Sequence, residues 1–297
     1  MIYGFATRKL TDNYIEPFVE SNGGRFIKSL GQVGRYEKTT WIDFNREQWI
    51  KDKTPIAIFG ILRGTADLMR TAREHNIDYY YLDVNYDKEK DHSYFYRTND
   101  HRPNKSTRKR FYRITKNGQS LNKLINWKNF PEYENRIKVQ KRACGIKVYT
   151  EFFKTQGSKI LVLPPSEFIC TFYNYGTQED WINKTIDKIK KYSDREIIIR
   201  KKGDSTDFTE QLQETFCTVS SQTTAVICSI KYGIPSFCED ISCALPMSKT
   251  DLSQIENPYR PNKDEIENWI NGLLNAQFEE SEIKSGHALK IIEDLQL

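Results

Sequence analysis

Histidine is scarce in this sequence, and its cysteines are not spaced for metal binding. The chain has four histidines among 297 residues, and none of its six cysteines forms a Cys-x-x-Cys pair. A structural zinc site needs four such ligands at close spacing, so we expect no metal site. Cys217 and Cys228 fall on apolar strand and helix patterns, where a reduced thiol acts as a small apolar side chain. We therefore expect free thiols rather than disulfides.

Long hydrophobic runs are also missing. Apolar residues make up 38% of the chain and charged residues 29%, a composition typical of globular proteins. No window approaches the roughly 18 to 20 apolar residues that span a bilayer, and residues 1–10 lack a signal-peptide pattern. We expect no membrane span and a cytoplasmic location.

Two α/β patterns follow one another along the chain. At this length, two domains of about 150 residues are the usual expectation. In the first half, Ile56–Phe59 and Tyr79–Leu82 are strand patterns on either side of a helix pattern at Thr65–Glu74, which predicts a parallel sheet. Residues 130–159 are polar and have no clear period. We place the boundary there, with domains at 1–150 and 151–297.

The second half alternates strands and helices more regularly. Strands are predicted at 160–163, 196–199, 216–219 and 235–237, and helices at 178–192, 223–232, 263–274 and 281–295. This alternation predicts a doubly wound α/β domain, in which ligands bind beyond the carboxyl ends of the strands. Two such halves in series predict a cleft between them.

Polar residues follow two of these strands and form a candidate anion site. Arg200 and Lys202 come after the strand at 196–199, and the strand at 216–219 is followed by Ser220, Ser221, Gln222 and Thr223. Hydroxyl groups and the first N–H groups of a helix suit a phosphate or diphosphate. The alternative is that Ser220 and Ser221 only cap the next helix.

Positive charge is concentrated in one stretch of the first half. From Arg97 to Gly118 the chain has eight basic residues and one acid, a net +7, against +5 for the whole protein. Residues of about 87–117 lack periodicity and predict a long loop. The candidate contacts to nucleic acid are Arg63, Arg97, Arg102, Arg108, Lys109, Arg110, Tyr112 and Arg113. The alternative is a solvated loop with no specific partner.

Several motifs of the chain resemble a known family. The second half carries Leu163-Pro164-Pro165-Ser166, the run Ser220–Ala225 and Gly233-Ile234-Pro235, and the first half carries the turn Phe59–Gly64 and the strand Tyr80–Asp83. These motifs resemble those of GT-B glycosyltransferases, particularly capsule-polysaccharide-type enzymes and related phage-encoded proteins, and the likeness extends over about two thirds of the chain. The resemblance implies a GT-B-like α/β fold, with two Rossmann-like domains facing each other across a cleft.

The resemblance also implies an activity and its residues. The C-terminal domain would bind a nucleotide sugar, with UDP expected as the nucleotide and no metal required, and Glu239 and Asp240 would accept sugar or ribose hydroxyls. Asp83 is the candidate base that takes the acceptor proton, with Asp91 and His92 as alternates. The glutamate-rich C-terminal motif of many retaining enzymes is not clearly present, so the resemblance does not assign the stereochemistry.

Three functions fit this sequence. The first is glycosylation of hydroxymethylated pyrimidines in phage DNA, in the host cytoplasm, because the basic and aromatic segment suits a DNA acceptor. The second is transfer to a capsule or lipopolysaccharide glycan. The third is a nucleic-acid-binding protein without catalysis on a GT-B scaffold. Asp83 and His92 also have structural alternatives, as a turn cap and an exposed loop residue.

Overall fold

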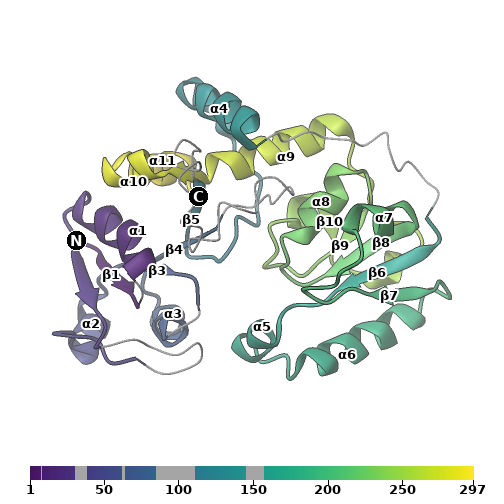
Figure 1. Ribbon diagram of the computed structural model, residues 1–297, viewed down its shortest axis with the longest axis horizontal. Helices are drawn as coiled ribbons and strands as arrows, with labels where there is room; N and C mark the ends of the chain where they lie inside the picture. Colours follow the sequence, from purple (N-terminus) through teal and green to yellow (C-terminus); the bar gives the residue numbers. More distant parts are fainter. Residues whose placement is uncertain (8, 31–38, 62–63, 85–110, 145–156) are drawn as a thin grey trace. The chain divides into compact units, whose positions relative to one another are not determined.

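The protein has an α/β fold whose parts belong to two compact units (Figure 1). A computed structural model describes residues 1–7, 9–30, 39–61, 64–84, 111–144 and 157–297. Unit 1 comprises Met1–Leu121, Ile125–Cys144 and Leu273–Leu297, and unit 2 comprises Asn122–Leu124 and Gly145–Gly272. The predicted boundary near residue 150 lies close to the division after Cys144. The C-terminal residues, however, pack in unit 1 and not in the second domain to which the sequence pattern assigned them.

Unit 1 contains a mixed six-stranded sheet in the order β11-β5-β4-β3-β1-β2. Its strands are β1 (Tyr3–Ala6), β2 (Arg25–Lys28), β3 (Ile56–Phe59), β4 (Tyr79–Val84), β5 (Phe111–Lys116) and β11 (Gln277–Glu279). The four strands β2, β1, β3 and β4 are parallel, whereas β5 runs antiparallel to both β4 and β11. The predicted loop at about 87–117 is therefore wrong at its C-terminal end, where β5 joins the sheet.

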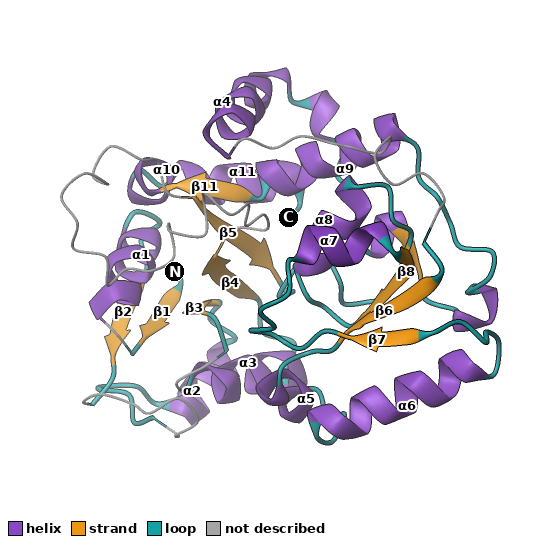
Figure 2. Ribbon diagram, turned by 45° about the vertical axis from the view of Figure 1, so that its right-hand side comes forward, coloured by secondary structure: helices purple, strands orange, loops and turns teal. Residues whose placement is uncertain are grey.

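Helices of unit 1, labelled in Figure 2, come from the first half of the chain and from its last residues. They are α1 (Lys9–Glu20), α2 (Arg46–Asp52), α3 (Thr65–Glu74), α4 (Glu134–Cys144), α10 (Glu280–Lys284) and α11 (His287–Leu295). α1 packs against β1 and also against α10. The single helix predicted at 281–295 is divided by Gly286, which has φ of +76° and begins α11.

The core of unit 1 is rich in aromatic side chains. Phe5 and Phe18 are fully buried, and Phe18 lies edge-on to Tyr80. Tyr112 of β5 is 5% exposed and packs against Tyr14 and Phe59, with ring centroids 4.0 and 6.2 Å away. The ring of Tyr112 is thus a core side chain, which corrects the prediction that it contacts nucleic acid.

Unit 2 contains a five-stranded parallel sheet in the order β10-β9-β8-β6-β7. The strands are β6 (Lys159–Leu163), β7 (Ile197–Ile199), β8 (Thr215–Ser220), β9 (Ser236–Phe237) and β10 (Ser248–Lys249). The helices are α5 (Glu167–Phe172), α6 (Gln178–Lys190), α7 (Phe208–Gln213), α8 (Ala225–Lys231) and α9 (Lys263–Asn275), whose last residues belong to unit 1. The strands predicted from apolar runs in this half are confirmed.

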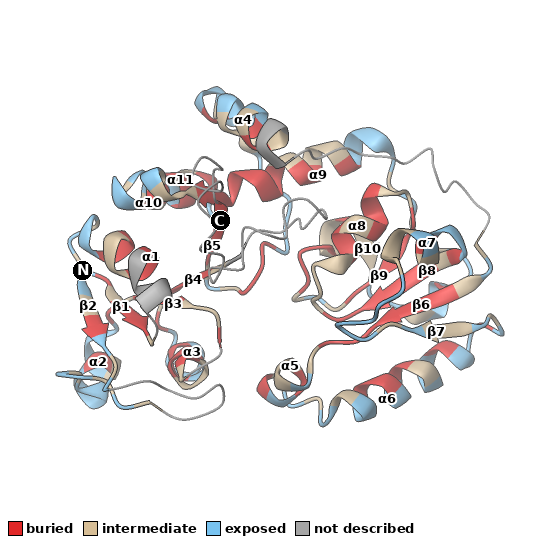
Figure 3. Ribbon diagram, in the orientation of Figure 1, coloured by how far each residue is buried: buried red, intermediate tan, exposed pale blue. Residues whose placement is uncertain are grey.

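Helices cover both faces of the unit 2 sheet, as in a doubly wound fold. Alternate residues of β6 point to opposite faces: Ile160 and Val162 pack with Trp181 and Ile182 of α6, and Leu161 and Leu163 pack with Leu212 of α7. Figure 3 shows the buried side of α6 turned toward the sheet and its outer side exposed. In the described residues of either unit, no helix is both long and apolar enough to cross a membrane.

Candidate functional site

The strand order of unit 2 indicates that a ligand would bind at the carboxyl edge of its sheet. From β6 the chain passes to β7 on one side and then returns to β8 on the other, so the order reverses between β6 and β8. Ligands of doubly wound sheets bind at this switch point, beyond the carboxyl ends of the strands. Leu163 at the end of β6 pairs with Ser220 at the end of β8. The segment Ser220–Thr223, predicted as an anion site, therefore begins at the switch point.

The carboxylate of Glu239 is the centre of a polar cluster at this edge. Glu239 follows β9, which is the neighbour of β8. Its Oε2 accepts hydrogen bonds from Ser221 Oγ at 2.7 Å and from the Tyr175 hydroxyl, and its Oε1 accepts one from Trp181 Nε1 at 3.0 Å. Three donors from three separate segments thus hold one half-buried carboxylate. We call Glu239, Ser221, Tyr175 and Trp181 the Glu239 cluster.

The connection between α5 and α6 places two members of this cluster. Gly176 has φ of +88°, and a Cβ there would lie 2.7 Å from Asp180 Oδ2, so the tight turn after Tyr175 requires glycine. A capping box follows, in which Thr177 Oγ1 accepts from Asp180 N at 3.0 Å and Asp180 Oδ2 accepts from Thr177 N at 2.8 Å. The box sets the start of α6 and puts Trp181 in its first turn.

Each donor to Glu239 is neutral. Among the described residues, no lysine, arginine or histidine side chain pairs with this carboxylate. Burial, and then the hydrogen bond to Glu239, raise the pKa of Tyr175 well above its usual value. The phenol consequently keeps its proton and acts as a donor. The negative charge at this edge of the sheet is held in place but not neutralised.

Two buried polar groups beside the cluster have no hydrogen-bond partner in the described part of the chain. They are Ser220 Oγ, in a residue that is 2% exposed, and Gln222 Nε2. An unmade hydrogen bond of a buried group costs about 1–3 kcal/mol, and a ligand atom is one way to supply the partner. The helix that follows has Thr224 as its N-cap, without a side-chain hydrogen bond. The alternative that Ser220 and Ser221 cap this helix is therefore wrong.

Other predicted donor-site residues make hydrogen bonds elsewhere or are exposed. The guanidinium of Arg200 donates to Gln211 Oε1 at 2.6 Å and to the Thr206 carbonyl at 2.8 Å, and lies over the Phe208 ring. Arg200 thus holds the loop after β7 rather than reaching the cluster. Lys202 and Asp240 are exposed, and Thr223 Oγ1 accepts from Ala225 N at 3.3 Å.

The predicted base Asp83 is engaged in an ion pair. Asp83 lies opposite Arg113 in the register of β4 and β5, and Arg113 Nη2 is 2.7 Å from Asp83 Oδ2. The Tyr81 hydroxyl donates to the same oxygen at 3.1 Å. Arg113 is 7% exposed, so its guanidinium pairs with Asp83 inside unit 1 and is not available to nucleic acid. This corrects the prediction that Arg113 contacts nucleic acid. This pairing also does not favour Asp83 as a base.

The remaining predicted contacts fall outside the described residues. These are the alternate bases Asp91 and His92 and the basic residues Arg63, Arg97, Arg102, Arg108, Lys109 and Arg110. They stay predictions from sequence. Of the predicted nucleic-acid contacts, the structure describes Tyr112 and Arg113, and both are buried.

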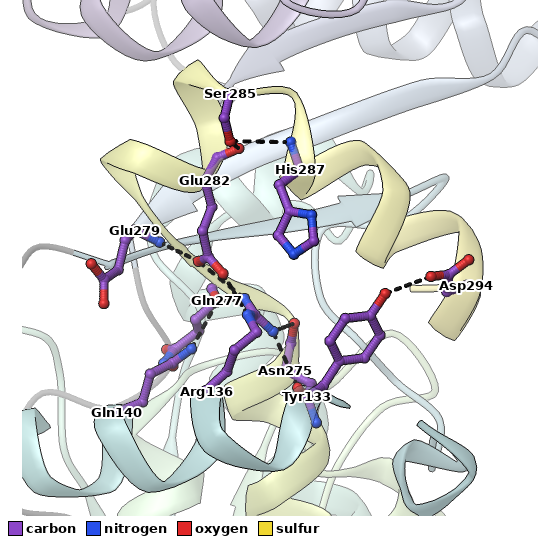
Figure 4. Close-up of polar contacts among 10 residues, drawn as sticks. All are labelled: Tyr133, Arg136, Gln140, Asn275, Gln277, Glu279, Glu282, Ser285, His287 and Asp294. Atoms are coloured by element: carbon purple, nitrogen blue, oxygen red, sulfur yellow. Dashed lines mark hydrogen bonds and ion pairs between the residues drawn. The ribbon is translucent and has the colours of Figure 1, made fainter. Parts of the chain in front are cut away.

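A second polar cluster, in unit 1, was not predicted from the sequence (Figure 4). Arg136 of α4 binds both carboxylate oxygens of Glu282, with Nε–Oε1 at 2.5 Å and Nη2–Oε2 at 3.2 Å, and also donates to Asn275 Oδ1 at 3.1 Å and to the Gln277 carbonyl at 2.8 Å. Gln140, one turn along α4, exchanges hydrogen bonds with Gln277. These contacts join α4 to β11 and α10, which explains why the C-terminal residues belong to unit 1.

Neither the metal chemistry of the described residues nor similarity to known proteins assigns a function. No group of three or more histidine, cysteine, aspartate or glutamate side chains in the described ranges is placed to hold a metal ion. Comparison with protein-family models and with curated protein sequences finds no match. The geometry of the Glu239 cluster is therefore the main evidence for function.

Proposed function

We propose that this protein is a nucleotide-sugar-dependent glycosyltransferase of the GT-B type, with its donor bound at the carboxyl edge of the unit 2 sheet. The observation that carries this proposal is the Glu239 carboxylate, held by three neutral donors beside the β6/β8 switch point. A carboxylate accepts hydrogen bonds from hydroxyl groups, in which sugars and ribose are rich. The resemblance to GT-B enzymes points to the same class of ligand.

The charge of Glu239 determines which end of the donor lies beside it. A diphosphate would be repelled by an unneutralised carboxylate, whereas a neutral hydroxyl would be attracted. The diphosphate then belongs near Gln222, whose Nε2 is a donor without a partner in the described residues. Ser221, predicted to bind phosphate, instead donates a hydrogen bond to Glu239 and holds that carboxylate.

The transfer itself breaks the bond between the anomeric carbon and the diphosphate oxygen, and forms a bond from that carbon to an acceptor oxygen. The acceptor hydroxyl loses its proton to a base, and the departing diphosphate carries the bonding electrons away. Preorganised hydrogen-bond donors lower the barrier by stabilising the departing charge. UDP is the proposed nucleotide.

For the acceptor we propose hydroxymethylated pyrimidines in DNA, on the strength of the six basic residues against one acid between Arg97 and Arg110. This count leaves out Arg113 and Lys116, which pair with Asp83 and Asp78 inside unit 1. Phosphate contacts from such a segment would hold the DNA, and the target base would have to leave the duplex to be reached. A glycan acceptor and a DNA-binding protein without catalysis are the competing outcomes. The latter binds DNA with a steep salt dependence but binds no nucleotide sugar.

A two-step experiment tests these proposals. A thermal-shift panel of nucleotide sugars comes first, because a ligand that binds only the folded state raises the melting temperature. The Glu239→Gln variant should lose the shift, while Glu179→Gln, an exposed glutamate of α6, should keep it. Equal shifts in both variants would refute the assignment of Glu239 to the donor site.

The second step identifies the acceptor. DNA containing 5-hydroxymethylcytosine or 5-hydroxymethyluracil is incubated with the protein and the donors that bind, and its nucleosides are analysed by mass spectrometry. A hexose or pentose increment would establish DNA glycosylation. Donor binding without an increment would favour a glycan acceptor, and DNA binding without donor binding would favour the non-catalytic protein.

A further inference from the structure

The hydrogen bonds around Glu239 leave little freedom to its carboxylate. An ionised carboxylate offers about four acceptor positions on its two oxygens. Trp181 occupies one on Oε1, and Ser221 and Tyr175 occupy two on Oε2. About one position remains, and it lies on Oε1. A ligand hydroxyl would therefore meet this carboxylate in one orientation.

Tyr175 and Trp181 are suited to fixing that orientation. The indole N–H can only donate, and the raised pKa of Tyr175 keeps its hydroxyl protonated. Trp181 is 7% exposed and packs in the core beside Ile160 and Val162, and the Tyr175 ring stacks on Tyr173 with centroids 5.7 Å apart. Both donors are thus carried by rings whose positions are set by packing.

Within the described part of the chain, the Glu239 carboxylate is held by hydrogen bonds and not by an ion pair. A fully buried carboxylate is usually paired with a cation, whereas a half-buried one such as Glu239 can be held by neutral hydrogen-bond donors. Glu239 has three neutral donors and no cationic partner among the described residues. The acceptor position that remains on Oε1 lies near the switch point of the sheet, where ligands of doubly wound folds bind.

We infer that Tyr175 and Trp181 are positioning residues, which hold the Glu239 carboxylate so that Oε1 accepts a hydrogen bond from a neutral hydroxyl group of the ligand. This inference rests on the proposed function. It adds two residues to the site that do not touch the anionic part of the donor. It also limits the chemistry beside Glu239 to a hydroxyl-bearing group, because an anion would be repelled there.

The test compares ring-preserving variants. Tyr175→Phe and Trp181→Phe each remove one donor to Glu239, and Tyr192→Phe removes the hydroxyl of a tyrosine that is 50% exposed. For a UDP-sugar that binds the wild type, calorimetry should show affinity about five- to tenfold weaker in the first two variants and unchanged in the control. The KM for the donor should rise more than kcat falls. Equal affinities in all four proteins would overturn the inference.

A spectroscopic measurement separates this inference from the proposed function. The indole N–H resonance of Trp181, assigned from its loss in Trp181→Phe, should move in Glu239→Gln and in Tyr175→Phe, and should move again when a UDP-sugar is added to the wild type. A resonance that is the same in Glu239→Gln and wild type would show that Trp181 does not hold this carboxylate. If no nucleotide sugar binds the wild type, the proposed function fails, while the variants' effect on the resonance still decides whether Trp181 and Tyr175 position Glu239.

Discussion

Removal of the Arg136 side chain should destabilise unit 1 strongly. Arg136 and Glu282 are 12% and 17% exposed, and loss of one partner from a buried ion pair costs about 3–5 kcal/mol because the other charge stays behind. Some water reaches this pair, so we expect about 3 kcal/mol for Arg136→Ala. At roughly 2–4 °C for each kcal/mol, the melting temperature of unit 1 should fall by about 6–12 °C. Differential scanning calorimetry measures this change.

A matched variant on the same helix provides the control. Lys138 pairs with Glu134 of α4, but these side chains are 69% and 55% exposed, and such a pair contributes about 0.3–0.5 kcal/mol. Hydrogen exchange should show faster opening of β11 and α10 in Arg136→Ala, with the strands of unit 2 unchanged. A loss in Arg136→Ala no larger than in Lys138→Ala would refute the view that this cluster holds the C-terminal residues to α4.

Three further results are expected. Tyr112→Ala should lower the free energy of unfolding by about 3–5 kcal/mol in urea titrations, because it removes a core ring; a change in DNA binding at unchanged stability would contradict its placement. Asp83→Asn should cost about 2–4 kcal/mol, because the buried Arg113 loses its carboxylate, and unchanged stability would show the ion pair to be unimportant. The raised pKa of Tyr175 predicts that unit 2 loses stability as the pH rises above about 10, because the tyrosine of the unfolded chain ionises before that of the folded chain. Unfolding followed by circular dichroism should show a smaller loss of stability over this pH range in Tyr175→Phe than in the wild type.

Apolar runs were enough to predict β3 and β4 of unit 1 and β6 to β9 of unit 2, but not the parallel edge strands β2 and β10, which have two apolar residues and none, respectively. β3 and β6 are continuous apolar segments bounded by glycine or proline, which is typical of strands buried on both faces. β5 was missed because Arg113 lies at its centre, and a basic residue in a basic stretch favours a loop. The partner that makes a buried arginine acceptable is Asp83 on β4, and a single sequence does not reveal that pairing.

The packing of the C-terminal residues in unit 1 could not be predicted from the sequence either, because it also depends on a pairing between distant segments. β11 has three residues, too few for a recognisable strand period, and it pairs with β5, which is distant in the chain. Its place depends on the contacts of Arg136 and Gln140 with the Gln277 backbone. Such contacts are made by tertiary structure, whereas the helix at α9 was predictable from its own period.

The candidate site was predictable only where it follows the strands. Ser221 is predictable because residues that follow parallel strands gather at one edge of a sheet, whereas Glu239 is named by what the resemblance to GT-B enzymes implies. Tyr175 and Trp181 come from the connection between β6 and β7, and nothing in their own spacing shows that they turn toward β9. The signal that was available is the run Gly176-Thr177 with Asp180, a turn and capping box that place the start of α6 and therefore the position of Trp181.

The distribution of charge along this edge gives the proposed donor a direction. At the end of β9 the Glu239 carboxylate has no cationic partner in the described residues, while at the end of β8 the groups without a partner there are a neutral hydroxyl and a neutral amide. An elongated ligand with hydroxyls at one end and phosphates at the other has a lower interaction energy when its hydroxyls lie at β9 than when its phosphates lie there. Reversal of that orientation would place a diphosphate against Glu239. Glu239→Gln should for this reason weaken discrimination between the two ends of the ligand as well as the affinity itself.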